Sequence, residues 1–267
     1  MVLKPISDVA CGHRLYDALN SDQNPNKLLR FAMCGRYALI TPIQELEAAL
    51  GVVQTEIQTN QQLHLPTYNA SPGQTLPVII EHKWRQLRGM RWGLVPNWAP
   101  TAVSKGNTIN AQQETLTAKP SFRHLVQTNR CVVPISAFYE WQPMGNLRQP
   151  YAIMPTEGIA YLAGLWDRWI SPLDSSIIET FTVITTPSAG LMTNLHDRQP
   201  VVLAPKDLEQ WLDGKSLWPD LAPMLQSYAW PNWKSYPVSS MVNNVKHNSP
   251  QLLKEAPRMA TQGSLFG

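Results

Sequence analysis

The chain has 267 residues, a formal net charge of +3, and a composition that is 43% hydrophobic and only 15% charged. This balance excludes a disordered chain and allows a substantial core in one large domain or two small ones. The mild positive charge is compatible with binding to nucleic acid but does not require it. No apolar run is long enough to span a bilayer. The three cysteines have no paired spacing, which excludes a disulfide framework and favours a reducing compartment.

Residues 1–32 form a polar, mixed leader without the apolar segment or small-residue cleavage pattern of a secretory signal. The acidic residues Asp8, Asp17 and Asp22 argue against an acid-poor transit peptide. Three alternatives remain open: translation starts at Met33, the leader is made and then removed, or the leader is retained. The sequence favours the first.

A methionine directly before a cysteine, at Met33-Cys34, has a chemical consequence. Initiator methionine is removed when the next residue is small, which would leave Cys34 with a free α-amine beside its thiol. Amine and thiol have ordinary pKa values near 8 and 8.5, so both are partly deprotonated around neutrality. Such a 1,2-aminothiol condenses with aldehydes to a five-membered thiazolidine. The alternative is that Cys34 is an ordinary buried strand residue.

The elements that follow are mostly strands. We predict a helix from an N-cap at Thr41, with Gln44 completing a capping box, to Gly51. Strands are expected at residues 76–80, 84–94 (as a strand pair), 131–135, 137–141, 151–154, 159–166, 181–186 and 201–203, short helices at 119–127, 205–212 and 218–226, and a last strand or loop at 238–246. Because no regular βαβ alternation is present, we predict a single α+β domain over residues 33–253. It is built on a curved, barrel-like, mostly antiparallel sheet with short flanking helices, and residues 254–267 form a frayed tail.

Three polar residues are candidates for chemistry. Glu140 lies in the aromatic stretch Phe138-Tyr139-Glu140-Trp141, where desolvation would raise its pKa and suit a general acid or base, although an outward-facing strand glutamate is equally compatible. His196 precedes an apolar strand, as loop-borne catalytic groups often do, but a lone histidine is more often structural. Asn110 could bind a substrate or cap a turn. Histidine and cysteine spacing indicates no metal site, and no glycine-rich phosphate loop indicates a cofactor.

Taken together, eight stretches in order resemble the SOS response-associated peptidase (SRAP) family, whose members crosslink to abasic sites. Single motifs are weak, but their shared order over about residues 33 to 250 is specific. The stretches are Cys34-Gly35-Arg36-Tyr37, Tyr68-Asn69-Ala70-Ser71-Pro72-Gly73, Trp92-Gly93-Leu94-Val95-Pro96-Asn97-Trp98, Ile109-Asn110-Ala111, Arg130-Cys131-Val132-Val133-Pro134, Phe138-Tyr139-Glu140-Trp141, Leu195-His196-Asp197-Arg198-Gln199-Pro200 and Val242-Asn243-Asn244.

The resemblance implies that the protein traps the ring-opened aldehyde of an abasic site in single-stranded DNA and protects the lesion during the SOS response. The amine of Cys34 would form a Schiff base that its thiol closes to a thiazolidine, with Glu140 and His196 as acid and base and Asn110 orienting the cysteine and the sugar. Autoproteolytic removal of the leader and a DNA lyase side activity are implied as well. We expect a monomer without metal or cofactor, in the cytoplasm and on the nucleoid when bound to damaged DNA.

The same resemblance implies the DNA contacts. Arg36 and Arg198 would hold phosphates, and Pro72 and Trp98 would wedge or stack at a strand break. Gln112 occupies a further DNA-binding position but departs from the pattern, because the family usually has arginine there. Ala99 stands where a second aromatic often follows. Two other functions remain open: a cysteine peptidase that acts on its own leader, and a non-catalytic single-stranded-DNA-binding module.

Overall fold

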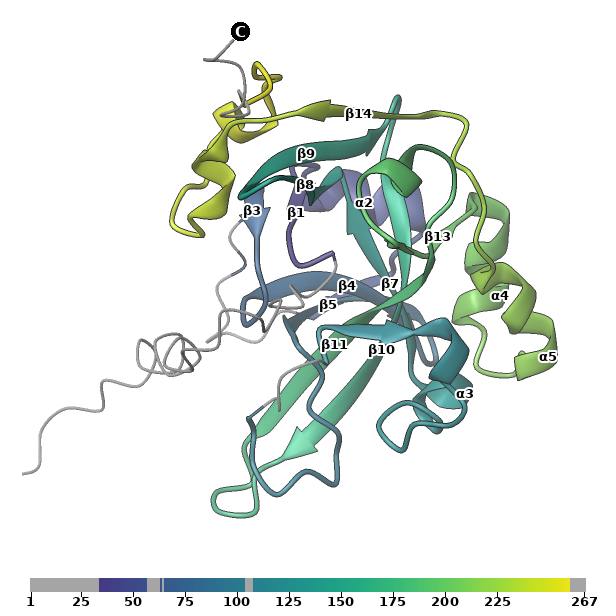
Figure 1. The fold of residues 1–267 in the computed structure, drawn as a ribbon. Helices are drawn as coiled ribbons and strands as arrows, with labels where there is room; N and C mark the ends of the chain where they lie inside the picture. The colour runs from purple at the N-terminus through teal and green to yellow at the C-terminus, as the bar shows by residue number, and fades with distance from the viewer. Residues whose placement is uncertain (1–33, 57–62, 64, 104–107, 260–267) are drawn as a thin grey trace, which may run out of the picture. The chain divides into compact units, whose positions relative to one another are not determined.

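Five strands of the larger sheet close into a barrel in the order β11-β10-β7-β4-β5 and back to β11 (Figure 1). The closing pair, β5 with β11, is parallel, and the other four pairs are antiparallel. The barrel strands are β4 (Thr75–Glu81), β5 (Arg85–Trp92), β7 (Arg130–Ile135), β10 (Ala160–Ile170) and β11 (Ile177–Pro187). The expected α+β class with a barrel-like sheet is therefore confirmed.

This computed structural model describes residues 34–56, 63, 65–103 and 108–259. The chain divides into residues Met1–Phe31 and Ala32–Gly267, and every described residue belongs to the second unit. The predicted leader, residues 1–32, lies outside the described residues.

Four further strands extend the barrel sheet. Strands β2 and β6 run parallel to β5 and β11, respectively, whereas β12 and β13 are antiparallel to β11 and β10. Their bounds are β2 (Gln54–Glu56), β6 (Asn110–Gln112), β12 (Arg198–Pro200) and β13 (Val202–Leu203). Strands β6 and β12 are important for the site because both pair with β11.

A second sheet of five antiparallel strands has the order β14-β9-β8-β1-β3 and lies above the barrel in Figure 1. Its strands are β1 (Tyr37–Leu39), β3 (Thr67–Ala70), β8 (Ala137–Met144), β9 (Leu147–Pro155) and β14 (Trp233–Pro237). Tyr37 pairs with Ala70 of β3 on one side and with Phe138 of β8 on the other. The strand that follows Cys34 is therefore an inner strand.

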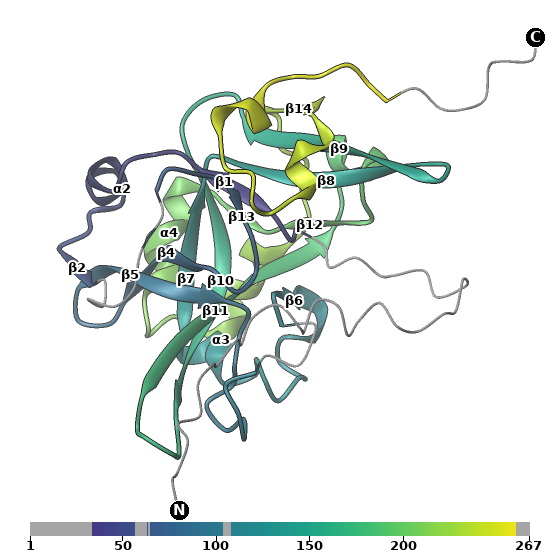
Figure 2. The same cartoon turned by 90° about the vertical axis from the view of Figure 1, so that its left-hand side faces the viewer.

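Alternation along β8 gives the second sheet two buried faces. Phe138 belongs to the main hydrophobic core between the sheets, whereas Tyr139 packs in a smaller cluster on the outer face. The 3₁₀ turns η6 (Ser240–Asn243) and η7 (Pro250–Leu253) cover that outer face through Val242 and Leu252, and both are seen in yellow in Figure 2. Glu140, two residues after Phe138, consequently faces the main core.

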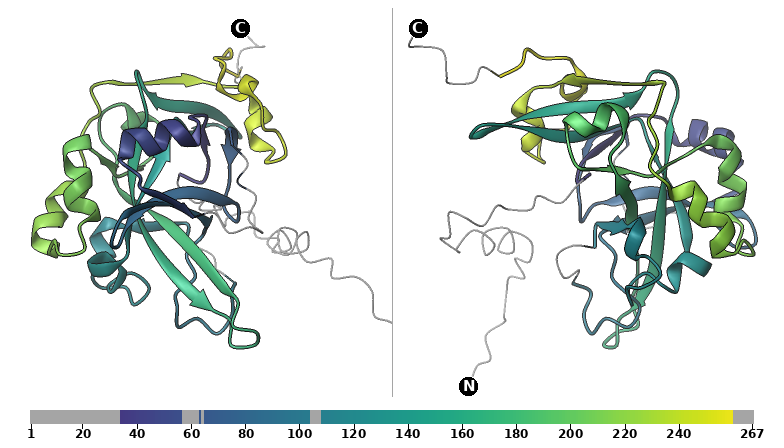
Figure 3. Two further views of the ribbon diagram at one scale, coloured as in Figure 1. Left: turned by 180° about the vertical axis from the view of Figure 1, so that it is seen from behind. Right: turned by 45° about the vertical axis from the view of Figure 1, so that its right-hand side comes forward.

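Short helices flank the barrel, and the green helices α4 and α5 stand beside it in the rear view of Figure 3. The apolar residues Leu208, Trp211 and Leu212 of α4 are buried in the core. The α-helices are α2 (Ile43–Leu50), α3 (Leu125–Thr128), α4 (Leu208–Leu212) and α5 (Trp218–Leu221). The other 3₁₀ helices are η2 (Gln113–Thr115), η3 (Gly190–Asn194), η4 (Pro205–Asp207) and η5 (Ala222–Leu225).

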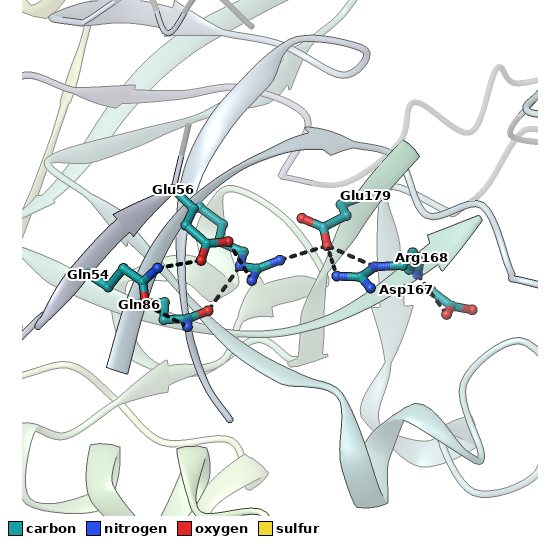
Figure 4. Close-up of polar contacts among 7 residues, drawn as sticks. Gln54, Glu56, Gln86, Asp167, Arg168 and Glu179 are labelled. Atoms are coloured by element: carbon teal, nitrogen blue, oxygen red, sulfur yellow. Dashed lines mark hydrogen bonds and ion pairs between the residues drawn. The ribbon is translucent and has the colours of Figure 1, made fainter. Parts of the chain in front are cut away.

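An ionic network crosses the seam where the barrel closes (Figure 4). Glu179 of β11 is buried and accepts hydrogen bonds from Arg88 of β5 at 2.9 Å and from Arg168 of β10 at 2.8 Å. Arg88 also pairs with Glu56 of β2 at 2.6 Å. The network links β2, β5, β10 and β11, so the buried charge of Glu179 is compensated only when these strands lie together.

Several predicted boundaries are wrong. Helix α2 ends at Gly51, which has a φ of 62° as expected, but its N-cap is Pro42, and Thr41 lies 3.5 Å from the Ser136 hydroxyl instead of capping the helix. Residues 84–94 hold a single strand, β5 (Arg85–Trp92), which pairs with β4, and not a strand pair.

In the C-terminal part, the last strand, β14, was not predicted. It precedes residues 238–246, which hold the turn η6, so of the two alternatives for that segment, a strand or a loop, the strand is wrong. In the tail, Ala256 N–H donates to the Pro237 carbonyl and Met259 N–H to Gln149 Oε1, so the tail follows the second sheet up to residue 259. Residues 260–267 lie outside the described part.

Candidate functional site

Glu140 of β8 joins two distant parts of the chain at one buried point. Its Oε1 accepts a hydrogen bond from the backbone nitrogen of Cys34 at 2.7 Å, and the Cys34 thiol hydrogen-bonds to the same carboxylate. Both side chains are buried, with only 4% of each residue exposed. One carboxylate therefore contacts both groups of Cys34 that the aminothiol chemistry would use.

Burial changes the protonation of both groups. Desolvation raises the pKa of the Glu140 carboxyl, and electrostatic attraction to His196 and the hydrogen bonds from Cys34 oppose that shift. Desolvation also raises the pKa of the Cys34 thiol well above its ordinary value, and the negative charge of Glu140 adds to this, whereas Arg198 lowers it. The thiol therefore keeps its proton in this environment, and Glu140 is the group placed to exchange protons with Cys34.

Cys34 itself has an unusual backbone conformation. Its φ is 43°, in the left-handed region that residues with a side chain seldom adopt. This torsion is defined by the peptide bond to Met33, so it disappears when that bond is cut. A non-glycine residue held in this region marks local strain at the point where processing is expected.

His196 is half-buried in the turn after η3, where its backbone N–H donates to the Met192 carbonyl at 3.0 Å. Its Nδ1 lies 2.7 Å from Asp197 Oδ1 and 3.1 Å from the backbone nitrogen of Arg198. The first contact requires a proton on Nδ1 and the second a lone pair, so only one can be a hydrogen bond at a time. We assign the proton to the carboxylate contact, because a charge-assisted hydrogen bond is the stronger of the two.

Asn110, Gln112 and Arg198 meet around one strand of the barrel. Asn110 is the half-buried first residue of β6, opposite Val183 of β11, and Gln112 is exposed opposite Thr185. Arg198 opens β12 on the other side of β11, and its guanidinium donates to the Thr185 carbonyl at 2.7 Å. Gln112 and Arg198, which are both predicted to contact DNA, therefore lie on either side of Thr185.

Arg198 has a second partner that the sequence analysis missed. Glu114, just after β6, accepts from both terminal nitrogens of the guanidinium, with the Nη2 contact at 2.9 Å. The arginine lowers the pKa of the Glu114 carboxyl. Pairing across 84 residues leaves no local signal in the sequence, so only the fold reveals it.

Arg36 is bound to the C-terminal segment in this structure. Its Nη1 donates to Asn69 Oδ1 at 2.8 Å and to the Val242 carbonyl at 2.7 Å, and its Nη2 donates to the Asn243 carbonyl at 3.2 Å. Asn69 in turn donates to the carbonyls of Asn244 and His247. Two of the recognised motifs, around Asn69 and Val242, thus come together to hold the Arg36 side chain.

Pro72 and Trp98 are both exposed, on neighbouring loops at one end of the barrel. The loops are joined where Gly73 N–H donates to the Trp92 carbonyl at 2.8 Å and Trp92 N–H donates to the Gln74 carbonyl at 3.0 Å. With 62% of its surface exposed, the indole of Trp98 is free to stack. The two predicted wedge residues therefore share one end of the molecule.

A polar cavity of about 430 Å³ lies beside the partner of Arg36. Its lining includes Asn69, Gln74 and Asn248 and carries no charged side chain. Gln74 Oε1 accepts from Ser71 N–H and Asn248 Oδ1 from Tyr68 N–H, which fixes how both amides are oriented.

No group of three or more histidine, cysteine or acidic side chains could hold a metal ion among the described residues. Within the same residues, no helix is long and apolar enough to cross a membrane.

Comparisons with known proteins identify the family of the chain. A sequence model of the family described as SOS response associated peptidase (SRAP) matches residues 33–245. The abasic site processing protein YoqW of Bacillus subtilis is 35% identical over 226 residues, which cover 83% of this chain and 99% of YoqW. The abasic site processing protein HMCES of Xenopus tropicalis is 31% identical over 221 residues, which cover 70% of this chain and 65% of HMCES.

A crystal structure of a protein from Bacteroides thetaiotaomicron has the same fold. Its TM-score is 0.74 at 24% sequence identity, and the match covers 84% of this chain and 100% of that one. At this identity the likeness concerns the fold alone.

Proposed function

The chain belongs to the SOS response associated peptidase (SRAP) family, and from that premise we propose that it processes abasic sites in single-stranded DNA by crosslinking to them through Cys34. The observation that carries the proposal is the contact of one buried carboxylate, Glu140, with both the nitrogen and the thiol of Cys34. This arrangement suits an aminothiol that reacts with an aldehyde.

The reaction first requires the free amine of Cys34. Either initiator methionine is removed, or water is added across the Met33–Cys34 peptide bond. The φ of 43° at Cys34 supports self-processing, because cleavage would release that strained torsion. Without this step the nitrogen is an amide and is no nucleophile.

The amine then attacks C1′ of the ring-opened sugar. The nitrogen loses two protons in turn, one as the carbinolamine forms and one as it dehydrates. Glu140 relays both to the aldehyde oxygen, which leaves as one molecule of water to give an imine. The thiol adds to the imine carbon, its proton goes to the nitrogen, and a thiazolidine ring closes. In the overall reaction C1′ gains one bond to nitrogen and one to sulfur, its double bond to oxygen is broken, and the oxygen leaves as water.

The pKa directions support this order of steps. The buried Cys34 thiol has a raised pKa and is protonated, which suits addition to an imine that accepts the proton at the same time. A cysteine peptidase instead needs a thiolate before it meets its substrate, and an environment that lowers the thiol pKa. The arrangement therefore favours the amine as first nucleophile over a general peptidase activity, and a peptidase role would be confined to the leader.

His196 and the basic residues complete the proposed site. Protonated His196 influences Glu140 electrostatically, which fits a role in forming the imine and, in reverse, in releasing the crosslink. Arg36 and Arg198 would hold phosphates, Asn110 would orient the sugar, and Pro72 and Trp98 would stack where the strands separate. An imine on a protein amine also allows β-elimination at the sugar, which gives the DNA lyase side activity.

The test begins with the N-terminus of the purified native protein. Intact mass and N-terminal sequencing should show a chain that begins at Cys34. That protein should then form a heat-stable adduct with single-stranded DNA that holds one abasic site, and none with intact DNA. If residues before Cys34 are still attached and the adduct nevertheless forms, the aminothiol route is wrong.

A further inference from the structure

The loop that carries Trp98 is attached to the barrel on both sides of the indole. Before it, Asn97 N–H donates to Asp167 Oδ2 at 2.7 Å, and after it, the Ala99 carbonyl accepts from Trp169 Nε1 at 2.8 Å. Both partners are on β10, two residues apart, so they lie on the same face of the strand. An exposed side chain is thus flanked by two fixed backbone groups.

The two anchors are buried although the loop is not. Asp167 is 6% and Trp169 5% exposed, compared with 62% for Trp98. Asp167 uses both carboxylate oxygens, because Oδ1 accepts from Arg168 N–H at 2.8 Å while Oδ2 holds Asn97. A third contact, from Val95 N–H to the buried Thr180 hydroxyl at 2.9 Å, fixes the start of the loop.

We propose that Asp167 and Trp169 are positioning residues, which hold the loop of residues 93–99 so that Trp98 is presented to DNA in a fixed orientation. The proposal rests on the stacking role given to Trp98 under the proposed function. A side chain that is already ordered loses less conformational freedom when a base stacks on it, so anchoring strengthens binding without adding a contact to DNA. Among the described residues, neither anchor hydrogen-bonds to Cys34 or Glu140, so the crosslinking step itself should not depend on them.

The two anchors can be weakened separately without removing their bulk. In Asp167→Asn only one oxygen remains for two N–H donors, so one of the two backbone bonds is lost. In Trp169→Phe the ring stays but the donor to Ala99 is removed. Asp174→Asn is the matched control, because Asp174 is an exposed residue of the turn between β10 and β11 and has no contact with the loop.

The test combines hydrogen exchange with DNA binding in a double-mutant cycle. We expect faster exchange of the Asn97 amide in Asp167→Asn, and affinity for abasic single-stranded DNA about three- to tenfold weaker in either anchor variant, with the adduct formation rate at saturating DNA unchanged. In a Trp98→Ala background the anchor variants should cause no further loss, because coupled residues are not additive. Asp174→Asn should match the unmodified protein in every measurement.

Three results would overturn this proposal or part of it. Unchanged Asn97 exchange in Asp167→Asn, and also in Asp167→Leu, which keeps neither oxygen, would show that the carboxylate does not hold the loop. Equal affinity losses with and without Trp98 would show that the anchors act on the barrel and not through the indole. Normal DNA affinity of Trp98→Ala would show that Trp98 does not contribute to DNA binding, and the anchors could then have no effect on DNA through it. If the loop nevertheless exchanges faster in Asp167→Asn, the anchoring of the loop itself would stand.

Discussion

The backbone nitrogen of Cys34 and Oε1 of Glu140 are 2.7 Å apart, although 106 residues separate them in the chain. The contact exists because the turn that holds Cys34 leads into β1, which pairs directly with β8. Sheet register therefore fixes the distance between the proposed nucleophile and its acid–base group. The following predictions test what that distance achieves.

Replacing the Cys34 thiol separates the two steps of crosslinking. Cys34→Ser keeps the amine but has no thiol to close the ring, so we expect an imine that borohydride traps and that heat reverses. Denaturing gels with and without borohydride measure this. Cys131→Ala is the matched control, since that buried cysteine lies on β7 and should not affect the adduct. A heat-stable adduct from Cys34→Ser without borohydride would contradict the thiazolidine.

Glu140→Gln should slow the chemistry and leave binding intact. Loss of a general acid and base reduces the rate by about 10²- to 10⁴-fold, whereas Glu140 makes no proposed phosphate contact. Single-turnover adduct formation gives the rate, and fluorescence anisotropy gives the affinity. Equal losses in both would instead identify Glu140 as a binding or folding residue.

The raised pKa of Glu140 also predicts how stability depends on pH. A carboxyl whose folded-state pKa exceeds its unfolded value favours folding below the unfolded pKa, and this contribution is lost as pH rises through the folded pKa. In the chain that retains Met33, Glu140→Gln should therefore be at least as stable as the unmodified protein at pH 7. The difference should shrink toward pH 4. Thermal unfolding at both values checks this, and a destabilised variant at pH 7 would contradict it.

Glu114 should compete with the phosphate that we propose for Arg198. Because Glu114 occupies both terminal nitrogens of the guanidinium, Glu114→Gln should tighten binding of single-stranded DNA. The dependence of log affinity on log salt should steepen by about 0.7, the value for one additional phosphate contact on a single strand. Combining it with Arg198→Ala should abolish the gain. Weaker binding by Glu114→Gln would mean that Glu114 orients the arginine instead.

Gln112→Arg should restore the phosphate contact that this chain lacks at that position. Gln112 is exposed, so the substitution should leave stability unchanged, while affinity rises and the salt slope again steepens by about 0.7. Gln127→Arg adds the same charge at an exposed position on α3 and serves as the control. An equal gain from both variants would reveal a general charge effect and no specific contact.

The sequence predicted the barrel-like class because β-rich apolar segments and the missing βαβ alternation are local signals. It could not predict the parallel closure between β5 and β11, since nothing near Arg91 or Thr180 records their pairing. The false N-cap at Thr41 has a similar cause: the hydroxyl meets Ser136, a partner from another part of the chain. Strand β14 was missed because its exposed residues lack the alternation of a half-buried strand.

For the site, the order of the motifs along the chain identified the candidate residues, but it did not identify their hydrogen-bond partners. The burial of Glu140 follows from alternation with Phe138 along β8, and that expectation is confirmed. The pairing of Arg198 with Glu114 and of Arg36 with Asn69 depends on tertiary contacts, which no local pattern encodes. The roles of these residues toward DNA remain predictions.

The inner position of β1 has a practical consequence for handling the protein. Chain termini usually fray, but the residues after Cys34 are hydrogen-bonded to β8 and β3 on both sides, so an N-terminus created there would be held in place. An affinity tag that stays attached ahead of Cys34 would keep its nitrogen as an amide, so we expect it to block the proposed reaction without disturbing the fold. Preparations for assay should therefore carry their tag at the opposite end, or release it by a protease that leaves Cys34 first.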